Sequence, residues 1–344
     1  RWSRLQPALA PEFRMRTLEA RLADVAELVE EEIRTLPLDT TVNLDGAMGR
    51  IAMIVASRVL FGERLDRERA DELVSNQRVV VDWIGGRIGS LRAVVPLAPG
   101  RAGRTMRQRR KVLYGYAEEV VARRRRDDRA HDDVLQALLE ARPGGRPLRD
   151  REVREQVLGL FAAGNETTAA TMGWGMTFGA DHPEEWAALR DDPTAAEPYL
   201  HETLRLRPQA WGIGRSLKRQ LSCVPVGSER YRVRPHHGIV INVWGINRDP
   251  KLWPNPTSFE PLRQRSLTKD QERASFPFGL GPRGCIGQQL ALAEMLAVLP
   301  LLARHGDIRI DGTPVPDPVF TLRVRDGLRG RFTAPIQATP RAFQ

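Results

Sequence analysis

Apolar residues recur at helical spacing through the first two thirds of the chain, with polar residues between them. Three stretches show this pattern most clearly, and their apolar stripes are Leu18, Leu22, Val25, Leu28 and Val29, then Ile51, Ile54, Val55 and Val59, then Val134, Leu135, Leu138 and Leu139. Steps of three and four residues place such side chains on one face of an α-helix. The pattern therefore predicts that the first two thirds are mostly helical, with one face of each helix buried.

The pattern changes after Pro208. Short β-rich pieces at residues 231–233 and 238–243 alternate with turn-rich sequence, and one more helix is expected from Gln288 to about Ala303. No internal repeat, low-complexity linker or abrupt change in composition marks a domain boundary. We therefore expect a single domain over residues 1–344 that is mainly α with small β-sheets.

The composition is that of a globular protein that does not insert into a membrane. Of the 344 residues, 41% are hydrophobic, which is enough to bury a large core. No apolar run approaches the roughly 20 residues needed to cross a bilayer, and no signal segment opens the chain. The two cysteines, Cys223 and Cys285, cannot form a disulfide framework, and no zinc-site spacing is present. We expect a cytoplasmic protein.

The chain carries a formal net charge of +10, which would suit an acidic partner or a nucleic acid. Its basic residues cluster at positions 101–111 and 123–126. Apolar residues at helical spacing accompany both clusters, and no aromatic residues interleave with the arginines to stack on bases. We therefore interpret the clusters as solvated helix faces and expect no nucleic-acid partner.

The stretch FPFGLGPRGCIG places Cys285 in a glycine-rich loop immediately before an apolar helical run. Unpaired N–H groups and the helix dipole favour an anion at a helix start, so the loop is expected to lower the pKa of the thiol. The loop glycines let a flat, bulky group approach the main chain. A thiolate in this setting is a metal ligand or a nucleophile, and no histidine stands in a context that suggests a base. A buried structural cysteine is the alternative, but it explains neither the glycines nor Arg283.

The same loop resembles the haem-binding loop of the cytochrome P-450 family, whose pattern FxxGxRxCxG is matched at Phe278, Gly281, Arg283, Cys285 and Gly287. The resemblance implies the family's fold, a helical prism around haem b (iron protoporphyrin IX). It also implies that Cys285 is the axial thiolate, that Phe278 shields the sulfur, and that Arg283 pairs with a haem propionate.

Upstream, LGLFAAGNETTAAT predicts a helix on which Ala163, Gly164, Thr167 and Thr171 share a face. Their small side chains would leave a gap beside the threonine hydroxyl, although an ordinary buried helix would also fit this pattern. The stretch resembles the family's oxygen-binding helix, with Glu166 in the acid position and Thr167 in the alcohol position. The resemblance implies that these two residues carry protons toward dioxygen.

In HETLRLRP, Glu202 and Arg205 are spaced i, i+3, which alone is weak evidence because many exposed helices contain such pairs. The motif resembles the family's buried Glu–Arg pair, and FEPLR then offers Arg263 as its third member. Arg215 is similar in position to the family's second propionate-binding arginine.

The opening RWSRLQPALAPEF resembles the family's third major helix. The resemblance implies that the N-terminal sheet, the first helices and the substrate-covering loop are missing from this chain. Trp2 then occupies a propionate-contact position, whereas Gln6 stands where the family usually has an arginine.

By this resemblance the protein is a soluble, actinobacterial type of monooxygenase. It would insert one atom of dioxygen into a hydrophobic small molecule, such as a secondary metabolite, with electrons from a ferredoxin or flavodoxin and its NAD(P)H reductase. The alternative is a non-catalytic helper or binding protein of the same fold. The expected pocket residues are Phe161, Ala163, Gly164, Thr171, Ala210, Trp211 and Leu328.

Overall fold

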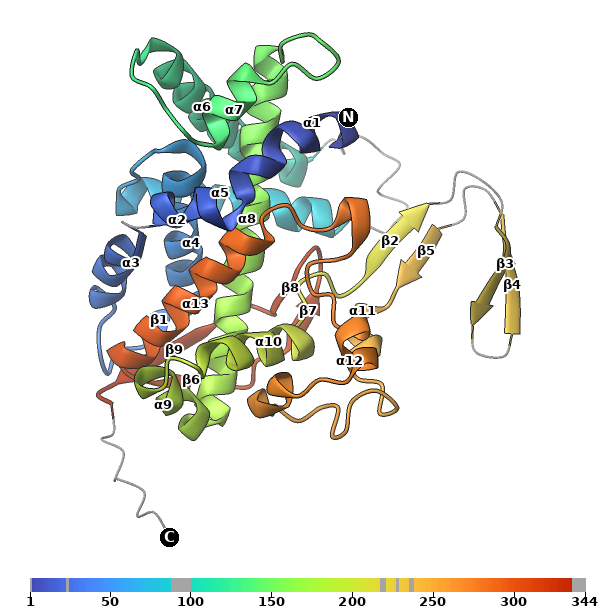
Figure 1. Cartoon of the computed structure of the whole chain (residues 1–344). Coiled ribbons are helices and arrows are strands. Elements are labelled where there is room, and N and C mark those ends of the chain that lie inside the picture. The colour runs from blue at the N-terminus through green and yellow to red at the C-terminus, as the bar shows by residue number, and fades with distance from the viewer. Residues whose placement is uncertain are drawn as a thin grey trace.

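Helices make up most of this computed structural model, which describes residues 2–22, 25–87, 100–216, 221–226, 229–234 and 238–335 (Figure 1). The α-helices are α1 Trp2–Leu9, α2 Met15–Leu22, α3 Val25–Arg34, α4 Leu44–Phe61, α5 Arg67–Gly85, α6 Arg101–Arg126, α7 Val134–Glu140, α8 Asp150–Asp181, α9 Pro183–Asp191, α10 Ala196–Leu206, α11 Val243–Ile246, α12 Lys269–Ala274 and α13 Gln288–His305. Short 3-10 helices are η1 Ala10–Phe13, η3 Pro261–Arg265 and η4 Gly281–Arg283. The mainly α expectation is confirmed.

Small antiparallel sheets lie at the edges of the helical body. Their strands are β1 Val42–Asn43, β2 Ile213–Ser216, β3 Leu221–Val226, β4 Glu229–Val233, β5 Gly238–Ile241, β6 Asp307–Ile310, β7 Pro316–Pro318, β8 Leu322–Val324 and β9 Arg329–Thr333. One sheet has the order β1-β9-β6, and the others are the pairs β2-β5, β3-β4 and β7-β8. The two β-rich pieces expected after Pro208 lie in β4 and β5, and the last expected helix is α13.

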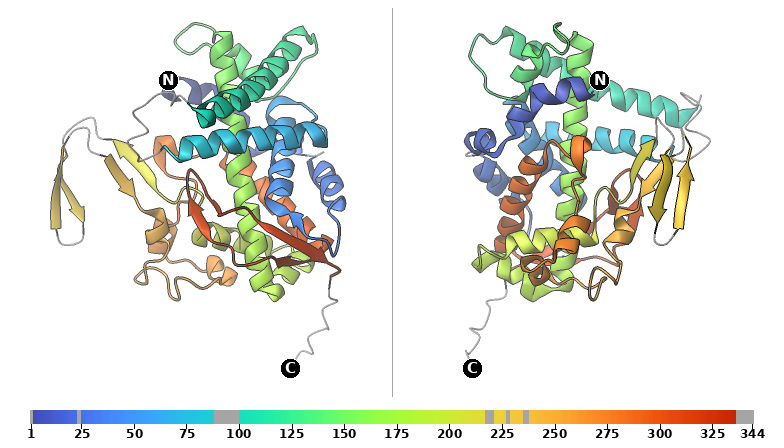
Figure 2. Two further views of the ribbon diagram at one scale, coloured as in Figure 1. Left: turned by 180° about the vertical axis from the view of Figure 1, so that it is seen from behind. Right: turned by 45° about the vertical axis from the view of Figure 1, so that its right-hand side comes forward.

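Helix α8 runs through the middle of the molecule and organises the packing, as Figures 1 and 2 show from three directions. It has 32 residues, which corresponds to a length of about 48 Å at 1.5 Å per residue. Helices α4, α6, α10 and α13 all contact it. Gly179 lets α9 pack closely against α8, because a Cβ at this position would overlap the ring of Trp186 on α9. No helix in the described residues is long and apolar enough to cross a membrane.

Helix α4 is fixed at both ends, and it in turn supports α8. Asn43 caps its start, where Oδ1 accepts a hydrogen bond from the Gly46 N–H at 3.0 Å. Gly62 ends it in the left-handed region with φ 66°. The resulting helix packs against α8 along a mostly buried stripe.

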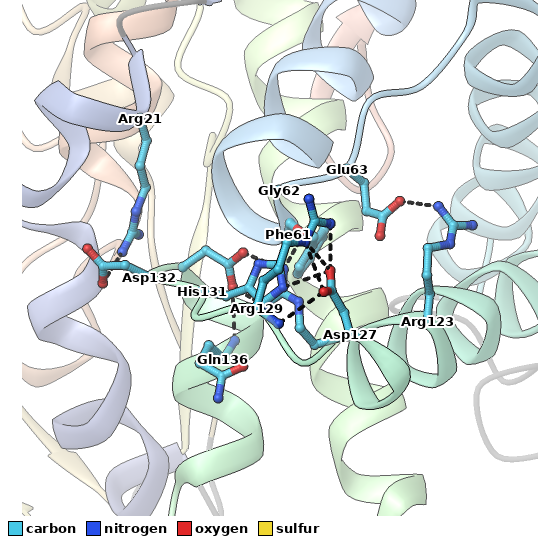
Figure 3. Close-up of polar contacts among 12 residues, drawn as sticks. Arg21, Phe61, Gly62, Glu63, Arg123, Asp127, Arg129, His131, Asp132 and Gln136 are labelled. Carbon is cyan, nitrogen blue, oxygen red and sulfur yellow. Dashed lines mark hydrogen bonds and ion pairs between the residues drawn. The ribbon is translucent and has the colours of Figure 1, made fainter.

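A buried ion pair between Arg124 and Asp133 joins the end of α6 to the start of α7. Figure 3 shows the polar contacts in this region, with Phe61 at the end of α4 and Gln136 on α7 labelled. Arg124 Nη1 donates to Asp133 Oδ1 at 2.7 Å, and Nη2 donates to the Phe61 carbonyl at 2.8 Å. Asp133 also caps α7 by accepting from the Gln136 N–H. The interpretation of residues 123–126 as a solvated helix face is therefore wrong for Arg124, which is buried and pairs with Asp133 at the start of α7.

Candidate functional site

The Cys285 loop is a tight backbone structure that ends on the first turn of α13. The Cys285 N–H donates to the Phe278 carbonyl at 2.8 Å, and the Gly284 N–H donates to the Gly281 carbonyl at 2.9 Å. Gly279 and Gly281 have φ angles of 72° and 68°, which residues with a Cβ rarely adopt. The loop thus holds the backbone of Cys285 in place through main-chain hydrogen bonds, and the thiol is not in a disulfide.

Cys285 opens into a cavity of about 460 Å³ that lies between its loop and α8. On the loop side the wall includes Phe278, Cys285 and Gly287, and on the α8 side it includes Ala163 and Thr167. The cavity wall also contains the predicted residues Gly164, Thr171, Ala210, Arg215 and Arg283. Two motifs more than a hundred residues apart in the sequence therefore face each other across one space.

Burial raises the pKa of the Cys285 thiol above its ordinary value, because surrounding protein withdraws the sulfur from bulk water although the residue opens to the cavity. A hydrogen bond from the Gly287 backbone opposes this effect and is the weaker of the two. The expectation that the helix start lowers the thiol pKa is therefore wrong for the chain alone. The chain alone therefore favours the neutral thiol of Cys285.

The α8 side of the Cys285 cavity is lined by small residues, among them Ala163 and Gly164. Thr167 Oγ1 donates to the Ala163 carbonyl at 2.7 Å, and Thr171 Oγ1 donates to the Thr167 carbonyl at 2.9 Å. A Cβ at Gly164 would contact only Ala56, at 3.8 Å. With its proton directed to Ala163, the Thr167 hydroxyl keeps its lone pairs available as acceptors.

Glu166 lies on a different face of α8 from Thr167, because successive helical residues are rotated by about 100°. It lines a separate small cavity beside Asp45, Arg78 and Arg323. Thr321 Oγ1 donates to Glu166 Oε1 at 3.2 Å. Burial raises the pKa of Glu166, whereas nearby Arg323, Thr321 and Arg78 lower it. Glu166, the expected acid, and Thr167, the expected alcohol, are adjacent in the sequence, but their side chains line different cavities.

Arg215 and Arg283 bring positive charge to the rim of the Cys285 cavity. Both are exposed, and Arg215 hydrogen bonds only to the carbonyl of the preceding Gly214, at 2.9 Å. Neither pairs with a carboxylate among the described residues. Two guanidinium groups are therefore free to bind anionic groups of a ligand.

The structure brings Glu202, Arg205 and Arg263 together beneath this site. Arg205 holds Glu202 through two bonds, Nε to Oε2 at 2.9 Å and Nη2 to Oε1 at 2.7 Å. Arg263 Nε lies 3.0 Å from Glu202 Oε1, and Gln264 Nε2 donates to Oε2 at 2.7 Å. Arg205 also donates to three backbone carbonyls in the segment that leads to η3, those of Asn247, Pro256 and Ser258.

Three residues expected in the pocket do not line the Cys285 cavity. Phe161 stacks on Phe61 with centroids 5.0 Å apart and lines a different cavity, because Leu160 rather than Phe161 shares the helical face of Thr167. Leu328 is buried against α8, held there by hydrogen bonds from its backbone to the start of α4. Trp211 is half-buried and does not line the Cys285 cavity. The side chain of Trp2 lies outside the described residues.

Sequence reasoning missed two buried polar residues in the cavity wall. Glu294 on α13 is 3% exposed and Gln209 is 7% exposed, and Glu294 Oε1 and Gln209 Oε1 both lack a hydrogen-bond partner among the described residues. Burial raises the pKa of Glu294 well above its ordinary value. One sequence signal could have identified Glu294, because this acid interrupts the apolar run of the last helix. Whether Glu294 is buried, however, depends on how α13 packs against the other helices.

Replacing Glu294 by glutamine should remove a pH dependence of stability. The native state keeps a proton on Glu294 at pH values where the unfolded chain has released it, so stability falls as pH rises above the unfolded pKa of about 4.3. Relative to Glu294→Gln, the wild type should lose up to about 1.4 kcal/mol per pH unit until the folded pKa is reached. Urea unfolding at several pH values measures this difference. Glu27→Gln, at an exposed position, is the control, and parallel curves for wild type and Glu294→Gln would contradict the assignment.

Comparisons with known proteins agree with this geometry. A family model described as cytochrome P450 matches residues 1–324. A relative from Mycobacterium tuberculosis (strain H37Rv), named as a cytochrome P450, is 28% identical over 349 residues, which span 96% of this chain and 70% of the relative. Cyclooctat-9-en-7-ol 5-monooxygenase from Streptomyces melanosporofaciens is 29% identical over 333 residues, which span 90% of this chain and 70% of that protein.

A solved structure shows the same fold. It is a 6-coordinated cytochrome P450 from Thermus thermophilus, and it matches 96% of this chain and 80% of its own with a TM-score of 0.74 and 23% identity. The chain therefore belongs to the cytochrome P450 family, and it is a monooxygenase of that family. The resemblance inferred from the Cys285 loop is confirmed for family and fold.

The residues of the Cys285 cavity fit a haem. The free thiol of Cys285 faces the cavity, a loop with two left-handed glycines leaves the main chain open beside it, and the facing α8 wall is notched at Gly164. Arg215 and Arg283, which pair with no carboxylate among the described residues, are available to bind the carboxylates of a haem. The cysteine loop supplies the thiol, the open main chain and Arg283, β2 supplies Arg215, and α8 supplies the facing wall.

Proposed function

We propose that this chain binds haem b through Cys285 and inserts one atom of dioxygen into a hydrophobic small molecule. The observation that carries the proposal is the free Cys285 thiol facing Ala163 and Thr167 across a single cavity. A haem iron held by a thiolate supplies dioxygen activation, because the sulfur pushes electron density onto the metal and favours O–O cleavage. The alternative of a non-catalytic helper does not require this pairing of cysteine loop and threonine.

In this proposal the chain's own side chains hold the group and move protons. Arg215 and Arg283 bind the propionates, and Phe278 covers one side of the sulfur. Thr167 accepts a proton at Oγ1 and passes on its own hydroxyl proton. Glu166, which is half-buried, is the acid that resupplies protons to Thr167 after turning from its separate cavity. The direction of the Glu166 pKa shift supports this role, because burial raises the pKa and so favours the protonated form that can donate.

A second cavity, of about 250 Å³, is the proposed substrate site. It lies between α4, α5, α6 and α8, and the side chains of Leu73, Val81, Leu113 and Phe161 make its walls apolar. Such a site suits a hydrophobic ligand held by a few polar contacts. The Streptomyces relative, whose name gives a largely hydrocarbon alcohol as substrate, supports the same class.

Electrons are proposed to come from an acidic ferredoxin or flavodoxin with its NAD(P)H reductase. The chain is basic, with net charge +10, and transient redox encounters are steered by complementary charge. Phe13 lines the Cys285 cavity, and Arg14 and Arg16, which follow it, are exposed. This surface is the proposed docking site beside the cysteine loop. We also expect Arg4 to belong to this docking surface, and its side chain lies outside the described residues.

Oxygen labelling tests the proposal. Haem-loaded protein supplied with a ferredoxin, its reductase, NADPH and ¹⁸O₂ should place one ¹⁸O atom in the product of an apolar substrate. Gly159 faces the second cavity with no atom near its missing Cβ, so Gly159→Leu should fill the cavity without a clash and lower product formation about tenfold or more. Gly115→Leu on α6 is the control, since Gly115 is equally open but does not line the cavity. Product without label, or equal loss in both variants, would refute the proposal.

A further inference from the structure

Among the described residues that line the apolar second cavity, Arg110 of α6 is the one with a charged side chain. Arg110 is exposed at the rim, and no carboxylate among the described residues pairs with it. Its guanidinium lies over the ring of Tyr114, with 5.4 Å between Cζ and the ring centroid, and Tyr114 lines the same cavity. Stacking on a neighbour one turn along the helix holds the charge at the cavity mouth.

Other polar groups in the cavity wall are already engaged. Gln77 Nε2 donates to Asn165 Oδ1 at 3.2 Å, and the Tyr116 hydroxyl bonds to the Ser57 hydroxyl at 3.1 Å. Arg110 and the Tyr114 hydroxyl therefore remain as the polar groups with capacity to bind a ligand in this described wall. One is a cation and the other is a donor, so both favour an anion.

The surrounding charge strengthens this preference. The first 17 residues of α6, 101–117, contain basic residues at six positions, Arg101, Arg104, Arg107, Arg109, Arg110 and Lys111, and no acid. The next acids along the helix, Glu118 and Glu119, form ion pairs with Arg154 and Arg69 on other elements. Positive potential is thus uncompensated along the helix segment that borders the cavity mouth.

We infer that the ligand of this cavity is an anionic amphiphile, a molecule with an apolar body and one carboxylate, whose head is bound by Arg110 and Tyr114 at the rim. The inference rests on the proposed function only in taking this cavity as the substrate site. An apolar body of this kind fills the space between α5 and α8, and the head stays partly hydrated at the mouth. A bidentate guanidinium–carboxylate pair also fixes which end of the molecule enters first.

Calorimetric titration of the haem-loaded full chain with decanoate and with decan-1-ol tests the inference, because the two probes share a chain and differ in charge. We expect decanoate to bind about fivefold more tightly at low salt, the upper range for an exposed ion pair. Arg110→Gln should abolish the preference for decanoate and leave the affinity for decan-1-ol unchanged. In the wild type, added salt should reduce the ratio of the two affinities. Arg104→Gln, exposed on the same helix but outside the cavity wall, is the matched control and should keep most of the preference.

Equal affinities for the two probes, or a preference that survives Arg110→Gln, would overturn the inference. Binding to phosphatidylglycerol vesicles without binding of monomeric decanoate would also overturn it, since the basic face would then serve a membrane surface. The titration needs neither electrons nor oxygen. A preference for decanoate that depends on Arg110, without ¹⁸O-labelled product, would therefore support the anion site and count against the proposed function. Labelled product without any preference for decanoate would support the proposed function and count against the anion site.

Discussion

Arg205→Ala is expected to destabilise the protein by about 3–5 kcal/mol and to prevent haem incorporation. Glu202 is fully buried and Arg205 is 2% exposed, so the substitution leaves a buried carboxylate with much of its compensation removed. It also removes the donors to the carbonyls of Asn247, Pro256 and Ser258, which hold the segment before η3 in place. The midpoint of urea unfolding and the haem content of the purified protein measure the effect.

Arg34→Ala provides the comparison for this substitution. Arg34 forms an i, i+4 pair with Glu30, and the two side chains are 68% and 47% exposed. Exposed pairs of this kind contribute about 0.3–0.5 kcal/mol. A normal holoprotein from Arg205→Ala, or similar losses in the two variants, would show that the Glu202 cluster is not essential to the fold.

Cys285→His is expected to abolish monooxygenase turnover while the fold is retained. The hydrogen bonds from the Cys285 N–H to Phe278 and from the Gly284 N–H to Gly281 do not involve the sulfur, so they survive the substitution, and only the Gly287 backbone loses its sulfur partner. An imidazole can still hold a haem, but it does not supply the electron density of a thiolate. Turnover measured with the ¹⁸O₂ assay should fall by at least about a thousandfold, since the loss of an essential group typically costs this much.

Cys223→Ser, a change of the other cysteine, is the control for Cys285→His and should keep turnover. Thermal unfolding of both variants separates loss of chemistry from loss of fold. Turnover of Cys285→His at the wild-type level would remove Cys285 from the proposed chemistry.

The sequence predicted the site well where a motif is short and locally rigid. The Cys285 loop has left-handed backbone at Gly279 and Gly281, which glycine adopts readily and other residues rarely do, so the loop's form can be inferred from its own twelve residues. Glu202 and Arg205 are one helical turn apart, and helix geometry alone brings them together. Features that depend only on neighbouring residues in the sequence can be predicted without knowing the rest of the fold.

Prediction was weaker where a residue's role depends on what packs beside its helix. Glu166 and Phe161 lie within a few residues of Thr167, yet the rotation of α8 turns each toward a different cavity. Gln264 enters the Glu202 cluster from a segment 62 positions away in the chain, which no local pattern signals. Which face of a buried helix meets which neighbour is a tertiary property.

Charge was the least predictable feature, because an arginine's environment depends on distant elements. Both basic clusters were interpreted as solvated faces, but Arg124 is buried on Asp133 and Arg110 lines a cavity. The chain's composition gave only the total charge, whereas burial and cavity position distinguish structural, ligand-facing and solvated arginines.

The reduced, carbon-monoxide-bound absorption spectrum of the haem-loaded wild-type protein tests the central claim most directly. A thiolate ligand from Cys285 predicts a strongly red-shifted Soret band, because electron donation from sulfur changes the electronic structure of the iron. Cys285→His should show the Soret position of an imidazole-ligated haem. A wild-type Soret band at that same unshifted position, in protein shown to be well folded, would contradict the assignment of Cys285 as the axial thiolate.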